Sequence, residues 1–193
     1  MELLGSSAAN GSDGPAGTPQ PRQPSPNDPN QPASGSFDGA NNRILGLTPS
    51  DPITGTDAAD SLIPTTAGSY AMTGKGGPDR FVFAVAEKRK LGNAEFITDF
   101  SEQEGDMLVL YADVIGIKSI RFRVAKNRKK VRKFSSKTTN LIYDQSKGHL
   151  IVDLNGSKKG LGGGGGLMAV FTNDAPLSEG SFGLLQGLPP VTI

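Results

Sequence analysis

Two aspartates in glycine-rich loops are the residues in this sequence best suited to bind a ligand. Asp60 ends the hexapeptide GTDAAD and Asp79 ends GKGGPD, so each carboxylate has the same place in a loop of small residues. Glycine lets such a loop adopt positive φ angles and turn carbonyl oxygens inward. Calcium takes about six to eight oxygen ligands from carboxylates and carbonyls. We therefore predict a calcium site, with ligands drawn from Gly55, Asp57, Asp60, Gly74, Gly76 and Asp79.

The spacing of large apolar residues indicates which elements hold these loops. Ile53, Leu62, Met72 and Phe81 follow one another at intervals of 9, 10 and 9 residues, and a turn-forming hexapeptide precedes each of the last three. The same period belongs to the nonapeptide G-G-x-G-x-D-x-U-x, in which U is a large apolar residue in a short strand of a parallel β-roll. Because two repeats make one turn of a roll, the first and third loops are expected on the same side. The alternative is an ordinary β-rich segment with regularly spaced turns.

None of the three repeats is perfect. Lys75 stands at the second glycine of the third repeat, and Thr56 and Ala58 stand at glycine positions of the first. Tyr70 replaces the aspartate of the middle repeat, whose loop is expected at the opposite edge. At most one well-formed calcium site is therefore expected, and the alternative is a roll that keeps its shape without metal.

The segments that follow the repeats carry a resemblance to a known family. GPDRFVF, residues 77–83, is followed by ITDF, an acidic turn and GDMLVL, within residues 97–110. This order resembles the C-terminal part of RTX, or haemolysin-type calcium-binding, proteins. The later run from NLIYDQSKG to GSFGLL resembles the tails of short cyanobacterial-type members, and the whole resemblance covers about residues 53–185.

The resemblance implies a fold, a ligand and a route of export. The fold class is all-β, with a short degenerate parallel β-roll over residues 43–93 and a β-sandwich-like cap over residues 94–193. Calcium is the implied ligand. Type I secretion machinery is the implied partner, acting on an uncleaved C-terminal signal that leaves the protein extracellular.

The N-terminal region lacks residues that build a core. Residues 1–42 are rich in Pro, Gly, Ser and Asn and are expected to form a disordered tail. The opening MELLGSSAANG has neither a basic segment nor an apolar core, so no N-terminal signal peptide is predicted. The chain has no cysteine, which excludes disulfides and thiolate metal sites.

Charge is divided unevenly along the chain. Residues 51–116 contain 11 acidic and 5 basic residues, whereas residues 117–193 contain 13 basic and 4 acidic residues. Within the basic part, alternation in IRFRV predicts a strand with Ile120, Phe122 and Val124 inward, followed by an exposed turn or edge.

The exposed basic residues of that segment have two interpretations. They form a solvated edge that resists aggregation, or they bind anionic glycans or membrane headgroups. Nucleic acid is a poor fit, because few aromatic residues are interleaved. The residues predicted to bind an anionic surface are Arg128, Lys129, Lys130, Arg132 and Lys133.

A second acidic cluster and a hairpin complete the pattern. Asp99, Glu102, Glu104 and Asp106 are interpreted as a structural turn, with a secondary cation contact as the alternative. LIYD and HLIVD flank QSKG and predict a β-hairpin, and LMAVF predicts a buried strand.

Catalysis finds no support in the sequence. The single histidine, His149, has no accompanying G-x-S-x-G motif, and the glycine run is not followed by GK[ST]. We therefore predict a secreted, non-enzymatic calcium-binding RTX-like module. The alternative is an adhesion or matrix-interaction protein that binds anionic surfaces without calcium.

Overall fold

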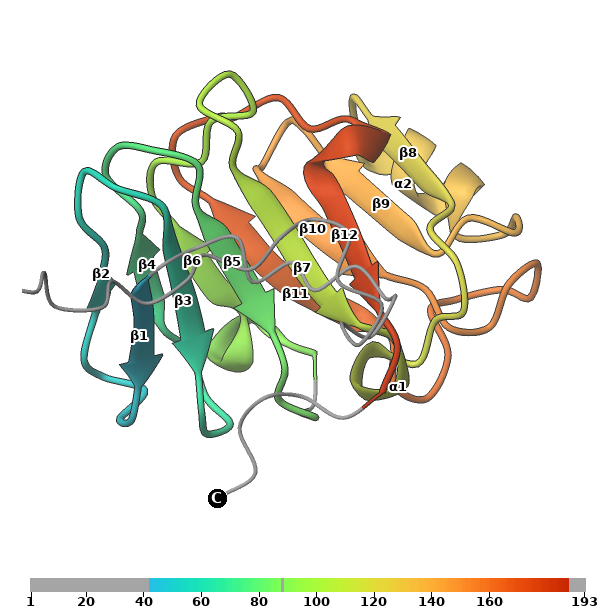
Figure 1. Ribbon diagram of the computed structural model, residues 1–193. Coiled ribbons are helices and arrows are strands. Elements are labelled where there is room, and N and C mark those ends of the chain that lie inside the picture. Colours follow the sequence, from blue (N-terminus) through green and yellow to red (C-terminus); the bar gives the residue numbers. More distant parts are fainter. Residues whose placement is uncertain (1–41, 88, 188–193) are drawn as a thin grey trace, which may run out of the picture. The chain divides into compact units, whose positions relative to one another are not determined.

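The computed structural model describes residues 42–87 and 89–187, and Figure 1 shows their arrangement. The predicted disordered tail lies outside the described residues, except for Asn42, which begins the first strand. Within the described part, most of the regular structure is β-strand and the helices are short. The β-rich fold class predicted from the sequence is therefore confirmed.

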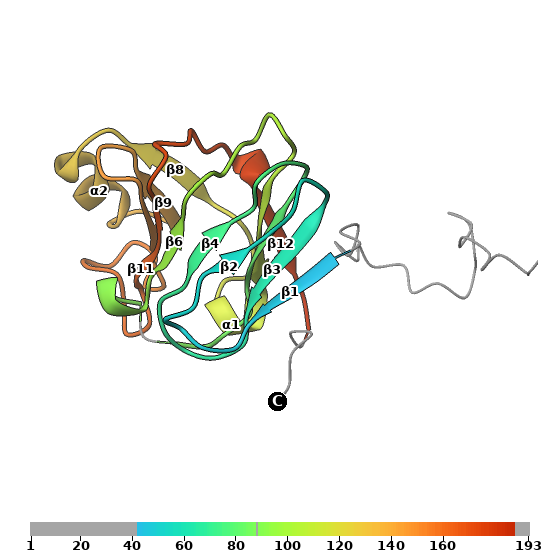
Figure 2. The ribbon, with the colours of Figure 1, turned by 90° about the vertical axis from the view of Figure 1, so that its left-hand side faces the viewer.

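The strands form two sheets. The first sheet has the order β1 (Asn42–Gly46), β3 (Asp60–Pro64), β5 (Arg80–Phe83), β7 (Met107–Tyr111) and β12 (Phe182–Leu185). The second has the order β2 (Ile53–Thr54), β4 (Ala71–Thr73), β6 (Glu95–Ile97), β11 (Gly166–Phe171), β10 (His149–Val152), β9 (Leu141–Asp144) and β8 (Phe122–Ala125). Figure 2 shows the two layers face to face.

The chain passes back and forth between these sheets. From β1 to β7 each successive strand joins the other sheet, and each pairs in parallel with the strand two places along the chain. Strand β12 is parallel to β7, and β11 is parallel to β6. The second sheet is mixed, because β10 runs antiparallel to both β11 and β9 while β8 is parallel to β9.

The core lies between the sheets and contains the periodic apolar residues. Ile53, Leu62, Met72 and Phe81 are 2%, 0%, 0% and 0% exposed. Ile53 is in register with Met72 in one sheet, and Leu62 with Phe81 in the other. Full burial of such a side chain contributes about 1.5–3 kcal/mol. The period of nine or ten residues therefore marks the side chains that hold the layers together.

Both sheets continue across residues 93–94, where the sequence predicts a boundary between roll and cap. Strand β6 pairs with β4, and β7 pairs with β5. Among the described residues, the connections contain four short helices: η1 (Leu91–Asn93), α1 (Ala112–Ile115), α2 (Arg128–Phe134) and η2 (Glu179–Ser181). No helix in the described ranges is long and apolar enough to cross a membrane.

The local predictions for the C-terminal half have mixed outcomes. The hairpin is confirmed as β9 and β10, and the buried strand as β11. The exposed turn predicted for the basic segment is wrong, because Arg128–Phe134 form helix α2. The side chain of Asn127 caps this helix by accepting from Lys130 N at 3.0 Å. The prediction for Val124 is also wrong, since β8 is an edge strand and Val124 is 37% exposed.

Candidate functional site

The two predicted calcium-binding loops lie side by side at one end of the sheets. Loop 55–59 joins β2 to β3 and loop 74–79 joins β4 to β5, at the upper end in Figure 1. Gly55 N donates to Thr73 O at 2.8 Å, and Gly76 N donates to Thr56 O at 3.3 Å. Because parallel strands place equivalent ends at the same edge, loops one full turn apart stack on each other.

Three aspartates form a ladder of hydrogen bonds at this end. Asp60 N donates to Asp79 Oδ1 at 2.9 Å, and Asp79 N donates to Asp106 Oδ1 at 2.9 Å. The other oxygen of Asp106 accepts from Ser101 N at 2.9 Å. Asp60, Asp79 and Asp106 are 0%, 1% and 6% exposed. The carboxylates of Asp79 and Asp106 therefore tie together the starts of β3, β5 and β7 in the first sheet.

One oxygen of each loop aspartate remains without a hydrogen bond. Asp60 Oδ2 accepts from Thr56 N at 2.5 Å and Thr56 Oγ1 at 2.9 Å, but Asp60 Oδ1 is buried without a partner. Asp79 Oδ1 accepts from Asp60 N, while Asp79 Oδ2 lies so close to Gly74 that a β-carbon there would clash with it. A β-carbon at Gly55 would clash with the Gly74 carbonyl oxygen. Glycine is thus required at both positions by close approach of oxygen atoms.

Burial and neighbouring charges raise the pKa values of two aspartates in this ladder. Desolvation raises the pKa of Asp79 to about 7, and the charges of Asp106, Asp60 and Asp99 add to the rise, while the hydrogen bond from Asp60 N opposes it. Desolvation also raises the pKa of Asp106, against the hydrogen bonds from Asp79 N and Ser101 N. Near neutral pH the folded protein therefore carries a proton on Asp79 part of the time. A cation at this place would favour the ionised form.

The predicted ligands separate into an inner and an outer group. Gly55, Asp60, Gly74 and Asp79 meet at the stacked loops, as described above. Asp57 is exposed, and its Oδ1 lies 3.8 Å from where a β-carbon of Gly76 would be. These two residues therefore lie on the outer side of the loops.

The oxygen atoms at the stacked loops suit a hard cation, provided that backbone carbonyls also act as ligands. Carboxylate and carbonyl oxygens are the ligands that calcium prefers. No group of three or more His, Cys, Asp or Glu side chains placed to hold a metal occurs within residues 42–87 and 89–187. Any cation at the loops would therefore depend on backbone carbonyls in addition to Asp60 and Asp79.

The structure adds two acidic residues that the sequence assigns to a separate turn. Asp99 Oδ1 accepts from Gly74 N at 2.9 Å and Asp99 Oδ2 from Lys75 N at 2.7 Å. Asp106 extends the ladder by one strand. Asp99 and Asp106 stand 24 to 27 residues beyond their donors, whereas Asp60 and Asp79 of the stacked loops are 19 residues apart, which is why the repeats do not reveal them. Lys75, at a glycine position of the repeat, has a φ of 73°.

The rest of the acidic turn is used structurally. Glu102 Oε1 accepts from Ser178 N at 3.1 Å and Ser178 Oγ at 2.7 Å, and also from Ser181 Oγ. These hydrogen bonds lower the pKa of Glu102 despite partial desolvation. They fasten the segment before β12 to the turn between β6 and β7.

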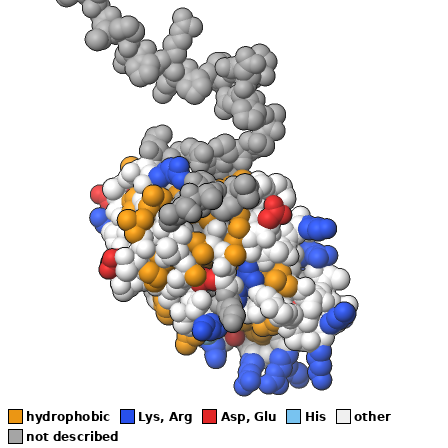
Figure 3. Space-filling view, turned by 90° about the horizontal axis from the view of Figure 1, so that it is seen from below, with side chains coloured by type: hydrophobic (Ala, Val, Ile, Leu, Met, Phe, Trp, Pro, Cys, Tyr) orange, Lys and Arg blue, Asp and Glu red, His pale blue; other side chains and the backbone are white. Residues whose placement is uncertain are grey.

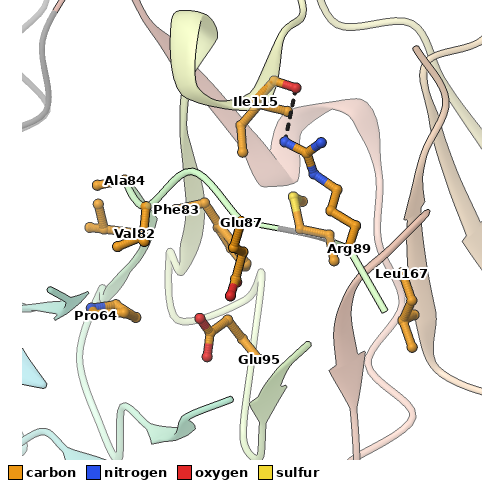
Figure 4. Close-up of a pocket in the computed structure, with 11 residues that line it drawn as sticks. Pro64, Val82, Phe83, Ala84, Glu87, Arg89, Glu95, Ile115 and Leu167 are labelled. Carbon is orange, nitrogen blue, oxygen red and sulfur yellow. Dashed lines mark hydrogen bonds between the residues drawn. The ribbon is translucent and has the colours of Figure 1, made fainter. Parts of the chain in front are cut away.

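A second carboxylate pair lies at the opposite end of the sheets, beside the loop of Tyr70. Tyr70 N donates to Glu95 Oε2 at 2.8 Å, and Gly68 N donates to Glu87 Oε2 at 3.0 Å. Both glutamates line a cavity of about 20 Å³, and Figure 4 shows their carboxylates facing each other, with Arg89 turned toward Ile115. Desolvation raises the pKa of Glu95 to about 8, and the charge of Glu87 adds to the rise.

A basic surface is carried by helix α2. It consists of Arg128, Lys129, Lys130, Arg132 and Lys133, all exposed. None of the five forms an ion pair with a described residue. Figure 3 shows Lys and Arg side chains gathered along one border of the molecule.

Comparison with known proteins identifies no relative: no family model, no curated protein and no solved structure matches the chain.

Proposed function

We propose that this protein is a secreted, non-enzymatic calcium-binding module, built as a short β-roll of the RTX type. The observation that carries the proposal is the pair of stacked loops, where Asp60 Oδ1 is buried without a partner and glycine alone fits at positions 55 and 74. Leaving a buried acceptor unpaired costs about 1–3 kcal/mol, and more for a charged group. A cation would remove that cost.

The alternation of strands supports the roll. Strands β2 to β7 alternate between the two sheets and pair in parallel two places apart, which is the winding that a β-roll requires. In this proposal Asp60 and Asp79 each supply one free carboxylate oxygen, and the loop backbone supplies carbonyl oxygens. Calcium would supply the charge that keeps both carboxylates ionised.

The affinity is expected to be modest. Two carboxylates give a site of low charge, and Thr56 already occupies the second oxygen of Asp60. We expect a Kd on the order of 10⁻⁴–10⁻³ M, the range of extracellular calcium modules. At ten times the Kd, binding adds about 1.4 kcal/mol to the free energy of unfolding.

Thermal unfolding tests the proposal. The melting temperature should rise by a few degrees between EDTA and about 10 mM calcium, and rise less with magnesium, which dehydrates reluctantly. Asp79→Ala should abolish the rise. Asp113→Asn, an exposed aspartate of α1, is the matched control and should preserve it. An unchanged wild-type melting temperature would reject calcium binding and leave a metal-free roll.

Export is the second part of the proposal and rests on the resemblance of the C-terminal region. We propose that type I machinery exports the protein through a signal in that region. Deleting residues 182–187 would remove β12 and its pairing with β7, so a loss of export would be ambiguous. Deleting residues 188–193 leaves β12 in place. Retention of that variant inside a type I-competent host would support an export signal in residues 188–193. Unchanged export would mean that the signal lies elsewhere or does not exist.

The basic surface supports a second candidate function, adhesion to anionic glycans or membrane headgroups without calcium. Five exposed positive charges without ion pairs raise the local potential. Replacing all five with serine should abolish retention on a polyanion column, and retention of the wild type should fall steeply with salt. If the wild type elutes at low salt, this surface is a solvated one.

A further inference from the structure

Two hollows adjoin beside the start of strand β8. One has a volume of about 250 Å³ and the other of about 230 Å³. Arg121, Thr138 and Thr139 line both hollows and form the lining that they share. None of the described residues that line them belongs to the loops of Asp60 and Asp79 or to helix α2. The hollows are therefore separate from the calcium site and from the basic surface proposed above.

A buried asparagine fixes this shared lining. Asn140 is 5% exposed, and its Oδ1 accepts from Arg121 N at 2.8 Å while its Nδ2 donates to Ser119 O at 2.6 Å. Asn140 N also donates to Arg121 O at 3.0 Å. The segments that supply Arg121 and Thr139 are thus joined before any ligand binds, which lowers the cost of ordering them around one.

The lining carries cations that are free to bind. Lys118 lines the larger hollow, Arg123 lines the smaller one, and Arg121 lines both. All three are exposed. The side chains of Lys118 and Arg121 form no hydrogen bond or ion pair with a described residue, and Arg123 donates to Phe122 O at 3.2 Å. A free guanidinium offers two parallel N–H groups that match the oxygens of an anion.

A hydroxyl group beside these cations is also free. Thr139 is 7% exposed, and its hydroxyl forms no hydrogen bond with any residue in the described ranges. The neighbouring Thr138 is exposed, and its hydroxyl likewise has no partner among the residues that the structure describes. A hydroxyl can donate one hydrogen bond. Arg121 and the two threonines therefore present donors to the same place, and an oxyanion would accept from them.

Two carboxylates limit the charge of the ligand. Asp153 lines the larger hollow and Glu179 lines the smaller one, so three cations and two carboxylates leave a net charge of +1 around the hollows. A single negative charge balances this lining, whereas a phosphate monoester carries about −1.5 to −2 at neutral pH.

The rest of the smaller hollow suits a sugar. Glu179 is exposed and its carboxylate has no partner among the described residues, so it can accept hydrogen bonds from sugar hydroxyls. Ile120 and Phe122 add apolar surface to the same lining, against which the C–H groups of a sugar ring can pack.

We propose that these hollows bind an acidic sugar whose single negative charge is a sulfate ester or a carboxylate. Arg121 and Thr139 hold the oxyanion, Lys118 and Arg123 add positive potential, and Glu179 accepts from a hydroxyl of the ring. One small ligand makes few contacts, so the Kd is expected on the order of 10⁻³ M. The site needs no calcium.

Amide resonances of the full-length chain test the site in EDTA and about 0.15 M NaCl, where diffuse attraction is screened. The probes are glucose 6-sulfate, glucuronate, glucose 6-phosphate, glucose and inorganic sulfate. Glucose 6-sulfate or glucuronate should shift the amides of Arg121 and Thr139 saturably, and the one that binds more tightly identifies the oxyanion. Glucose 6-phosphate and inorganic sulfate should bind more weakly, and glucose should cause no shift.

Three variants locate the response. Arg121→Gln should weaken binding by about tenfold or more, because it removes a charge-assisted pair of hydrogen bonds. Thr139→Val keeps the shape of the side chain and should weaken binding about fivefold through loss of one hydroxyl. Arg128→Gln makes the same change as the first variant on helix α2, outside the hollows, and should bind like the wild type.

Each contrary result overturns the proposal. No shift with either acidic sugar up to about 20 mM, some twenty times the expected Kd, would show that the hollows bind no such ligand. Equal binding by inorganic sulfate would show that the sugar is not recognised. Wild-type binding in Arg121→Gln, or weakened binding in Arg128→Gln, would assign the response to general attraction by basic residues. Because calcium is absent from the assay, none of these results bears on the loops of Asp60 and Asp79.

Discussion

Replacing Asp79 with asparagine separates the two roles of that carboxylate, as a titrating group and as a ligand. The folded-state pKa of Asp79 is about 7, above the ordinary value of 3.8. Between about pH 4 and about pH 7, in the absence of calcium, Asp79 of the folded protein therefore keeps a proton that the unfolded chain has already released. Stability must fall as the pH rises from about 4 to about 7, and stay level above it.

The size of the effect follows from that interval. Each unit of pKa difference corresponds to about 1.4 kcal/mol, so full ionisation of Asp79 lowers the free energy of unfolding by up to about 4 kcal/mol. Asparagine removes this loss while its Oδ1 still accepts from Asp60 N. Its amide nitrogen replaces Asp79 Oδ2 beside Gly74, and an unpaired donor there costs about 1–3 kcal/mol at every pH.

Denaturant unfolding in EDTA from about pH 4 to pH 8.5 measures the difference. The wild type should lose stability relative to Asp79→Asn from about pH 4 to about pH 7, and the difference should stay level above that. Glu95, at the opposite end of the sheets, titrates in both proteins and cancels in the comparison. In about 10 mM calcium near pH 8 the wild type alone should gain stability. Parallel pH profiles in EDTA would refute the elevated pKa, and equal calcium gains would refute the ligand role.

Three further substitutions test the surrounding geometry. Glu95→Gln keeps an acceptor for Tyr70 N and removes a carboxyl whose pKa is about 8. In chemical denaturation this variant should therefore gain stability relative to the wild type as the pH rises from about 4.5 to about 8, and a pH-independent difference would contradict this. Lys75→Gly relieves a left-handed φ of 73°, and should raise the free energy of unfolding by about 0.5–1 kcal/mol after the greater freedom of the unfolded chain is subtracted. A loss of stability would show that the lysine is not strained. Gly55→Ala forces a methyl against Gly74 O, so it should lower the free energy of unfolding by about 1–3 kcal/mol and abolish calcium stabilisation. A wild-type calcium response in this variant would show that the loops do not form the site.

The sequence predicts the repeated part of this molecule well because its period is set by a physical repeat. Ile53, Leu62, Met72 and Phe81 recur at the interval of one loop plus one strand, and burial follows directly from that spacing. The stacking of the first and third loops follows from the same winding.

Prediction fails where tertiary pairing overrides local pattern. The alternation through Phe122 and Val124 indicates a strand with both residues inward, but β8 lies at a sheet edge and Val124 is exposed. The basic run that forms helix α2 shows no helical pattern of apolar residues, and the cap residue Asn127 is its one local indication of a helix. Asp106 joins the ladder because β5 pairs with β7, and the nonapeptide repeats do not predict that pairing.

The central claim is that calcium binds between the loops of Asp60 and Asp79, and the amides of these two residues report on it most directly. Each donates to the next carboxylate of the ladder, at 2.9 Å in both cases. In a calcium titration of the full-length chain, both amide resonances should shift saturably with a Kd on the order of 10⁻⁴–10⁻³ M. Resonances that stay in place up to about 10 mM calcium, in a chain that remains folded, would contradict the claim.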